Sequence, residues 1–79
     1  MTKDWVEESK TLAAELRIVG LQESEKEILE AIFSGSTGTE ILMGVRWNLN
    51  KVLKEHPELS QGIQKRIREI NQGITTALG

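Results

Sequence analysis

The 79-residue chain contains no cysteine, no tyrosine, one proline and one histidine. Without cysteine it can form neither a disulfide framework nor a cysteine-based zinc site, and one histidine leaves too few soft ligands for a transition-metal centre. No apolar run approaches the about 20 residues that span a membrane, and the first residues lack the layout of a signal peptide. We therefore expect a cytoplasmic protein, in reducing cytosol, with no metal, no cofactor and no membrane segment.

Catalytic side chains are equally scarce. Nucleophilic and acid–base mechanisms need a nucleophile and a base held close together, and the single histidine, His56, stands beside Pro57 at an expected helix junction. We interpret His56 as a capping or surface residue. Carboxylates are numerous, but no pair of them is bracketed by apolar residues that would raise a pKa. The sequence favours a protein that is not an enzyme.

The charged residues are divided unevenly along the chain. Residues 1–40 carry nine acidic and four basic side chains, a net charge of −5, whereas residues 41–79 carry six basic and three acidic ones, a net charge of +3. The simplest interpretation is that the two halves attract each other across a folded bundle.

Apolar residues recur at helical spacing along the whole chain, and no segment alternates strictly between apolar and polar residues as a strand would. We predict helices over about residues 3–18, 23–34, 38–55 and 58–77. The connections are short, so neighbouring helices should run antiparallel. The sequence predicts one all-α domain, residues 1–79, folded as a compact antiparallel four-helix bundle with no β-strands.

Each expected helix has one apolar face, and the isoleucine-rich stripe of the last helix is the strongest periodic pattern. The inward positions expected for the four helices are, in chain order, Trp5, Ser9, Leu12, Ala13, Leu16 and Val19; Ile28, Leu29, Ile32 and Phe33; Ile41, Leu42, Val45, Leu49, Val52 and Leu53; and Leu59, Ile63, Ile67, Ile70, Ile74 and Leu78.

Helix ends are indicated by glycine, proline and capping patterns. Gly20 and Gly35 stand where the first two helices should end, and Pro57 suits the first turn of the last helix. Two capping boxes are expected to start the second and third helices, at residues 24–27 (SEKE) and 37–40 (TGTE).

The stretch at residues 33–41, FSGSTGTEI, has the small residues of a phosphate-binding loop. It lacks the lysine and the preceding strand that nucleotide-hydrolase loops need. Its pattern Gly-x-x-Gly-x-x-Ile, over residues 35–41 alone, resembles the loop of KH nucleic-acid-binding domains. That resemblance implies a three-stranded sheet, which this chain has no strands to form. We interpret the glycines as helix punctuation, with an anion site at the helix N-terminus as the alternative.

The third expected helix carries apolar side chains outside its core face. On a helical projection Met43, Trp47, Asn50 and Lys54 lie opposite the core positions, and two of them, Met43 and Trp47, are apolar. Either this helix is central and buried on two sides, or these residues meet a partner, because Trp, Met and Arg are enriched at protein interfaces. The predicted protein interface comprises Met43, Arg46, Trp47 and Asn50.

A second surface feature is an acidic row on the second expected helix, formed by Glu23, Glu27 and Glu30. Like charges at this spacing repel each other by a few tenths of a kcal/mol per pair. The plain interpretation is a solvated helix face, and the alternative is an acidic docking face for a basic partner.

These features favour a small helical protein–protein interaction module that binds a protein partner. It would act as an adaptor, or as an inhibitor similar in general character to the small acidic helical proteins that neutralise toxins. The alternative is a nucleic-acid-associated regulator that acts as a dimer through the basic second half, although Glu55, Glu58 and Glu69 interrupt its positive charge.

A homodimer is expected slightly more often than a monomer, because small domains gain core by pairing. Gly62 and Gly73 lie on one line of the last expected helix. Glycine there costs about 1 kcal/mol against alanine, so close approach of another helix would explain both residues.

Overall fold

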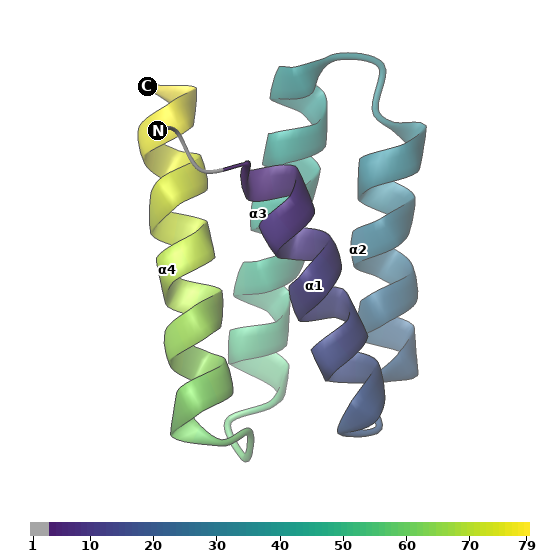
Figure 1. Ribbon diagram of the computed structural model, residues 1–79, viewed down its shortest axis with the longest axis vertical. Coiled ribbons are helices and arrows are strands. Elements are labelled where there is room, and N and C mark those ends of the chain that lie inside the picture. The colour runs from purple at the N-terminus through teal and green to yellow at the C-terminus, as the bar shows by residue number, and fades with distance from the viewer. Residues whose placement is uncertain (1–3) are drawn as a thin grey trace.

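The computed structural model describes residues 4–79, which form four helices joined by short turns (Figure 1). α1 spans Trp5–Ile18, α2 spans Gln22–Ser34, α3 spans Gly38–Glu55 and α4 spans Gln61–Leu78. This part of the chain contains no strand. The predicted all-α four-helix bundle is confirmed, and none of its helices is long and apolar enough to cross a membrane.

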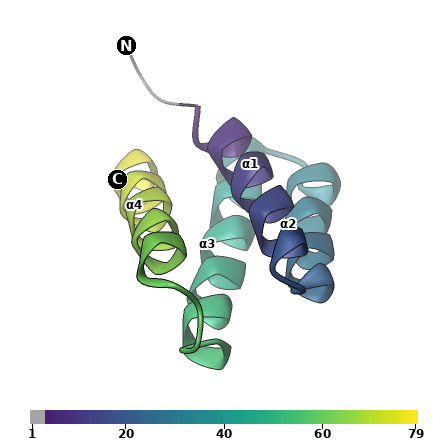
Figure 2. The ribbon, with the colours of Figure 1, turned by 60° about the horizontal axis from the view of Figure 1, so that its bottom comes forward.

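Three of the helices lie side by side, and the remaining one covers one face of this layer. Figure 1 shows α4, α3 and α2 next to one another with α1 tilted across them, and Figure 2 shows the same order after rotation. α3 is the middle helix of the layer, because it contacts both α2 and α4 while those two do not contact each other within residues 4–79. The face of the layer that is turned away from α1 carries no further helix of the described chain.

The core lies between α1 and the three-helix layer. Its buried side chains are Leu12, Ala13, Leu16, Ile28, Ile32, Val45, Leu49, Val52, Ile67, Ile70 and Ile74. All of them belong to the predicted apolar faces. Burial of each large aliphatic side chain contributes about 1.5–3 kcal/mol, so these four stripes are the main source of stability.

Two residues expected to face inward are exposed instead. Val19 is 48% exposed, because α1 ends at Ile18 and the helical periodicity no longer directs the next side chain to the core. Phe33 is 72% exposed in the last turn of α2, about 100° round the helix from Ile32. The ammonium of Lys10 lies 5.4 Å from the Phe33 ring centroid, a cation–π contact at the surface.

Several helix ends match the sequence patterns. Gly20 follows α1 with φ at +91°, the region that glycine occupies without strain, and Gly35 caps α2. At the start of α3 the Thr37 hydroxyl accepts a hydrogen bond from the Glu40 amide at 3.2 Å. The Glu40 carboxylate accepts the Ser36 amide at 3.4 Å, one residue before the amide that a standard capping box uses.

The start of α2 departs from its predicted capping box. The helix begins at Gln22, and Ser24 is a buried residue of its first turn that makes no cap. The preceding turn is tight, because the Leu21 amide already donates to the Leu16 carbonyl at 2.8 Å and closes the end of α1. Ser24 is therefore already helical and lacks the non-helical backbone that an N-cap residue needs.

The start of α4 also lies later than predicted. Ser60 caps the helix through its hydroxyl, which accepts the Ile63 amide at 3.3 Å, so the first helical residue is Gln61. Pro57 lies in the preceding turn, which the Leu59 amide closes by donating to the His56 carbonyl at 3.3 Å. Serine offers the hydroxyl that an N-cap requires and proline does not, which explains the shift.

The glycine line on α4 has an internal explanation at one of its two positions. A Cβ atom on Gly73 would lie 2.0 Å from Cζ2 of Trp5, so the Trp5 ring of α1 occupies the space beside this glycine. At Gly62 a Cβ atom would meet only the Ser60 hydroxyl, at 4.0 Å. The close approach predicted for a second helix is therefore made, at Gly73, by an indole ring of the same chain.

Ion pairs connect the acidic first half to the basic second half. Glu27 of α2 accepts a hydrogen bond from the Lys51 ammonium of α3 at 2.7 Å, and Glu15 of α1 pairs with Arg66 of α4. Each pair joins an acid of residues 1–40 to a base of residues 41–79, as the uneven charge distribution predicts. Both pairs are partly exposed, so each adds little to the stability of the fold.

Candidate functional site

The side of α3 turned away from α1 combines apolar and charged residues in one row. We call this row the outer face of α3, and it consists of Glu40, Met43, Trp47, Asn50 and Lys54, all of which are exposed. The residues are spaced alternately three and four positions apart, which keeps them on one side of a helix. The core residues Val45, Leu49 and Val52 occupy the opposite side of the same helix.

Trp47 is the most prominent residue of the outer face. Its side chain is 64% exposed, and Met43, one turn earlier, is 51% exposed. α3 is the middle helix of its layer, but the layer covers only the flanks of α3. Met43 and Trp47 therefore do not form a second internal core layer, which was one of the two interpretations left open by the sequence.

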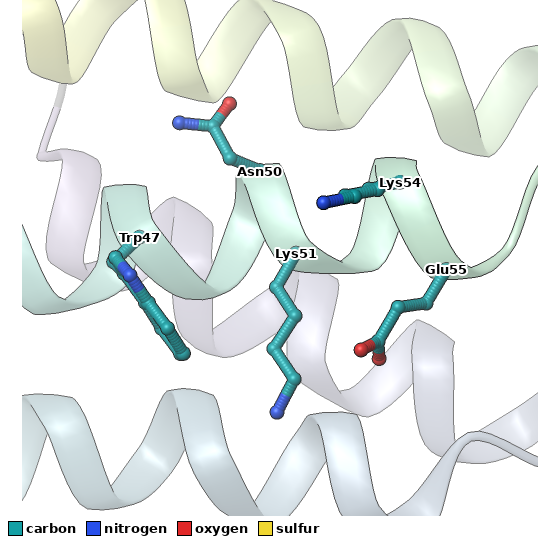
Figure 3. A pocket seen from close by; sticks show the side chains of 5 residues that line it. All are labelled: Trp47, Asn50, Lys51, Lys54 and Glu55. Carbon is teal, nitrogen blue, oxygen red and sulfur yellow. The ribbon is translucent and has the colours of Figure 1, made fainter.

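A shallow pocket of about 390 Å³ adjoins Trp47 (Figure 3). It is lined by Trp47, Asn50, Lys51, Lys54 and Glu55, all of them on α3. In Figure 3 the side chains of Trp47, Lys51 and Glu55 extend towards α2, whereas Asn50 extends towards α4. The pocket is thus a depression on the outer side of α3, open to solvent.

Lys51 holds the α2 side of this pocket in place. Its ammonium donates to the Glu27 carboxylate at 2.7 Å and lies 5.5 Å from the Trp47 ring centroid. The hydrogen bond to Glu27 raises the pKa of Lys51 above its ordinary value, although some desolvation opposes this. The protonated ammonium forms a cation–π contact that favours one orientation of the exposed indole.

The other two predicted interface residues lie at the α4 side. Asn50 accepts a hydrogen bond at its Oδ1 from the Asn71 side chain of α4, at 2.6 Å. Arg46 is partly buried. The structure therefore brings Met43 and Trp47 together as the exposed apolar centre, while Asn50 is fixed at the margin by α4.

The predicted acidic docking face is only partly available. Glu23 and Glu30 are exposed, but the Glu27 carboxylate between them is paired with Lys51 of α3 in a partly exposed ion pair. The two exposed acids are seven residues apart, about 10 Å along the helix. Glu27 thus contributes to the contact between α2 and α3 more directly than to an acidic surface.

The loop at residues 35–41 serves the helix ends. A Cβ atom on Gly35 would lie 2.5 Å from Cγ1 of Ile41, so the glycine permits a close return of the chain. The Glu40 carboxylate lies against the Ser36 amide, close to the N-terminus of α3 where an anion would otherwise bind. These contacts support the interpretation of the loop as helix punctuation.

His56 lies at the other end of α3 and caps it. Its amide donates to the Val52 carbonyl at 2.9 Å, and its Nδ1 lies 3.0 Å from the Glu58 carboxylate. The pKa of Glu58 is lowered, mainly by a hydrogen bond from its own backbone amide and further by His56. The capping role predicted for His56 is confirmed.

Sequence reasoning missed two features of the site. Glu40 extends the outer face at its N-terminal end, and Lys51 orients Trp47. The alternating spacing of residues 40, 43, 47, 50 and 54 was a signal that could have added Glu40 to the row. The pairing of Lys51 with Glu27 had no such signal, because it depends on how α2 and α3 lie against each other.

Neither similarity to known proteins nor a cluster of metal-binding residues identifies the function of this site. Comparisons with protein-family models, curated proteins and solved structures find no match to this chain. Within residues 4–79, no group of three or more His, Cys, Asp or Glu side chains is placed so that it could hold a metal ion.

Proposed function

We propose that this protein is a protein–protein interaction module, an adaptor or an inhibitor, that binds its partner through the outer face of α3. One observation carries the proposal: a tryptophan that is 64% exposed lies on the middle helix of a layer whose outer side is uncovered. Burial of a tryptophan side chain is strongly favourable, and tryptophan is the residue most enriched among interface anchors.

The dimensions and chemistry of this side suit a protein partner. The molecule extends over 31 × 24 Å along its two longest axes. A standard interface takes about 800 Å² of accessible surface from each partner, so a partner centred on α3 would also contact the neighbouring helices α2 and α4. Met43 adds a flexible apolar side chain next to Trp47, and the charged and polar residues around both supply the rim that interfaces require.

The nucleic-acid alternative has less support. Of the basic residues in the second half, Lys51 and Arg66 are paired with carboxylates, and Glu55, Glu58 and Glu69 lie among the others in the sequence. Phosphate binding needs several unopposed cations on one surface. The lack of cysteine supports the cytoplasm as the compartment in which the module acts.

Capture of a partner from native extract tests the proposal. Immobilised wild-type protein is compared with Trp47→Ala and with Phe33→Ala, a matched control because Phe33 is an exposed aromatic residue on α2. We expect Trp47→Ala to lose about 2 kcal/mol of binding, or about 30-fold in Kd, and Phe33→Ala to bind as wild type does. Circular dichroism confirms that both variants are folded. A partner that Trp47→Ala retains at full affinity would contradict the proposal.

A further inference from the structure

We propose that the outer face of α3 pairs with the same face of a second copy of this chain, with the two α3 helices antiparallel. The inference rests on the proposed function, because it uses the same surface, and it names the partner that occupies this surface in the isolated protein. A foreign partner would then compete with self-pairing.

The order of charges along the outer face favours a second copy of this chain as the partner. Glu40 lies at the N-terminal end of the row, Lys54 at the C-terminal end, and Trp47 is seven residues from each. At 1.5 Å per residue, both charges are about 10 Å from Trp47 along the helix axis. An antiparallel pair centred near Trp47 therefore places each Glu40 opposite the Lys54 end of the other copy.

The same order excludes a parallel pair. Parallel α3 helices in register would place Glu40 opposite Glu40 and Lys54 opposite Lys54, and like charges at an interface disfavour association. A twofold axis perpendicular to α3 generates the antiparallel arrangement, and twofold symmetry is the commonest form of self-association. Each attractive contact is then formed twice in one dimer.

The centre of the row provides the apolar contact. The alternating spacing of three and four residues is that of the seam between two helices that pack side by side. In a pair centred on Trp47, the Trp47 ring of one copy meets that of the other, and Met43 of each copy lies opposite Asn50 and Lys51 of the other copy. Lys51 extends towards α2, as Trp47 does, and its ammonium is already held by Glu27, so this ion pair lies at the α2 margin of the seam (Figure 3).

The proposed pairing also gives a role to the exposed residue Lys54. Lys54 is exposed and has no hydrogen bond or ion pair among residues 4–79, while Lys51 and Arg66 on the same half do. At the other end, Oε2 of Glu40 accepts a long contact from the Ser36 amide, at 3.4 Å, and no other hydrogen bond from the described part of the chain. Both end charges are therefore accessible for contact with a second copy.

Charge reversal tests the pairing by sedimentation equilibrium, with chain concentrations up to about 1 mM, where an association with a millimolar Kd is half saturated. We expect wild-type protein to dimerise. Lys54→Glu and Glu40→Lys should each weaken the dimer about tenfold, because each creates two repulsive contacts across the twofold axis. The double variant should restore the wild-type Kd to within about threefold, since it exchanges the charges. Lys65→Glu, the same charge change at an exposed position of α4, should have no effect.

Tryptophan fluorescence supplies an independent readout. In a Trp5→Phe background Trp47 is the only tryptophan, and its emission should shift to shorter wavelength as the chain concentration rises, because the dimer covers the ring. The shift should be lost in Lys54→Glu at concentrations where wild type is dimeric. Lys54→Glu leaves the Glu40 capping contact unchanged, so this variant reports on association without altering the helix end.

Three results would overturn the inference. They are a wild-type chain that is monomeric up to about 1 mM, a double variant weaker than either single variant, and a dimer that is insensitive to both charge reversals and to Trp47→Ala. The proposed function fails separately, when a captured partner is indifferent to Trp47→Ala. A monomeric chain that still binds a partner through Trp47 would therefore reject self-pairing alone.

Discussion

The two tryptophans of this protein lie in opposite environments. Trp5 stands at the start of α1, is partly buried against the core and occupies the space beside Gly73 of α4, where a Cβ atom would lie 2.0 Å from its ring. Trp47 stands on the outer face of α3, is 64% exposed and has the Lys51 ammonium 5.5 Å from its ring centroid.

The difference separates a structural aromatic residue from one that is free to bind. The fold provides a matching position for Trp5, because a residue without a side chain lies where the indole rests. No helix of the described chain covers the side on which Trp47 lies. Under the proposed function, this uncovered side of α3 is where Trp47 would contact another molecule.

Alanine substitution of each tryptophan should give the largest contrast. We expect Trp5→Ala to lower the free energy of unfolding by about 2–3 kcal/mol, somewhat less than for a fully buried tryptophan. Trp47→Ala should lower it by less than about 0.5 kcal/mol, as is usual for an exposed position. Urea denaturation at low chain concentration, where association is negligible, measures both. Equal losses would show that Trp47 is a structural residue and that the comparison is wrong.

Substitution of the two α4 glycines tests whether the Trp5 ring needs the space beside Gly73. Gly73→Ala should destabilise the protein by about 1–3 kcal/mol, because the new methyl group and the indole cannot occupy the same space. Gly62→Ala meets only the Ser60 hydroxyl, at 4.0 Å, and should stabilise by up to about 1 kcal/mol through helix propensity.

Thermal unfolding of both glycine variants provides the measurement, and a Trp5→Ala background provides the control. Without the indole, Gly73→Ala should no longer be destabilising. A Gly73→Ala variant as stable as Gly62→Ala in the presence of Trp5 would mean that the indole does not need this space.

Removal of the Lys51 charge should have the smallest effect on the free energy of unfolding. It tests the ion pair of Lys51 with Glu27, which lies beside Trp47. The folded protein binds the Lys51 proton more tightly than the unfolded chain does, so the ion pair with Glu27 stabilises the fold below the ordinary pKa of 10.5. This contribution is lost as pH rises through the higher pKa of the folded state.

Urea midpoints of wild type and Lys51→Gln, compared from neutral pH to about pH 11.5, measure this contribution. The small advantage of wild type should disappear at the alkaline end, while Glu27→Gln should lack it at every pH. Trp47 fluorescence should change over the same alkaline range. A difference between the variants that does not depend on pH would show that the Lys51 side chain acts through its aliphatic part.

The sequence by itself predicted the helices and the core, because both follow from local chemistry. Eleven buried hydrophobic residues were all placed inward by periodicity, since a helix turned by 100° per residue presents one apolar stripe wherever it packs. Thr37 was identified as a cap for the same reason, because its hydroxyl bonds to an amide only three residues later.

Tertiary structure alone decided what depends on contacts between distant segments. Ser24 and Thr37 have the same capping pattern, yet Ser24 lies inside α2 because the turn that closes α1 ends at Leu21 and the helix starts directly after it. Helical projection placed Trp5 inward and Trp47 outward, but could not say whether another helix covers the outer side of α3. The outer side of α3 is uncovered because α1 lies across the opposite side of the layer. The position of α1 results from burying the apolar faces of all four helices together, so no single face predicts it.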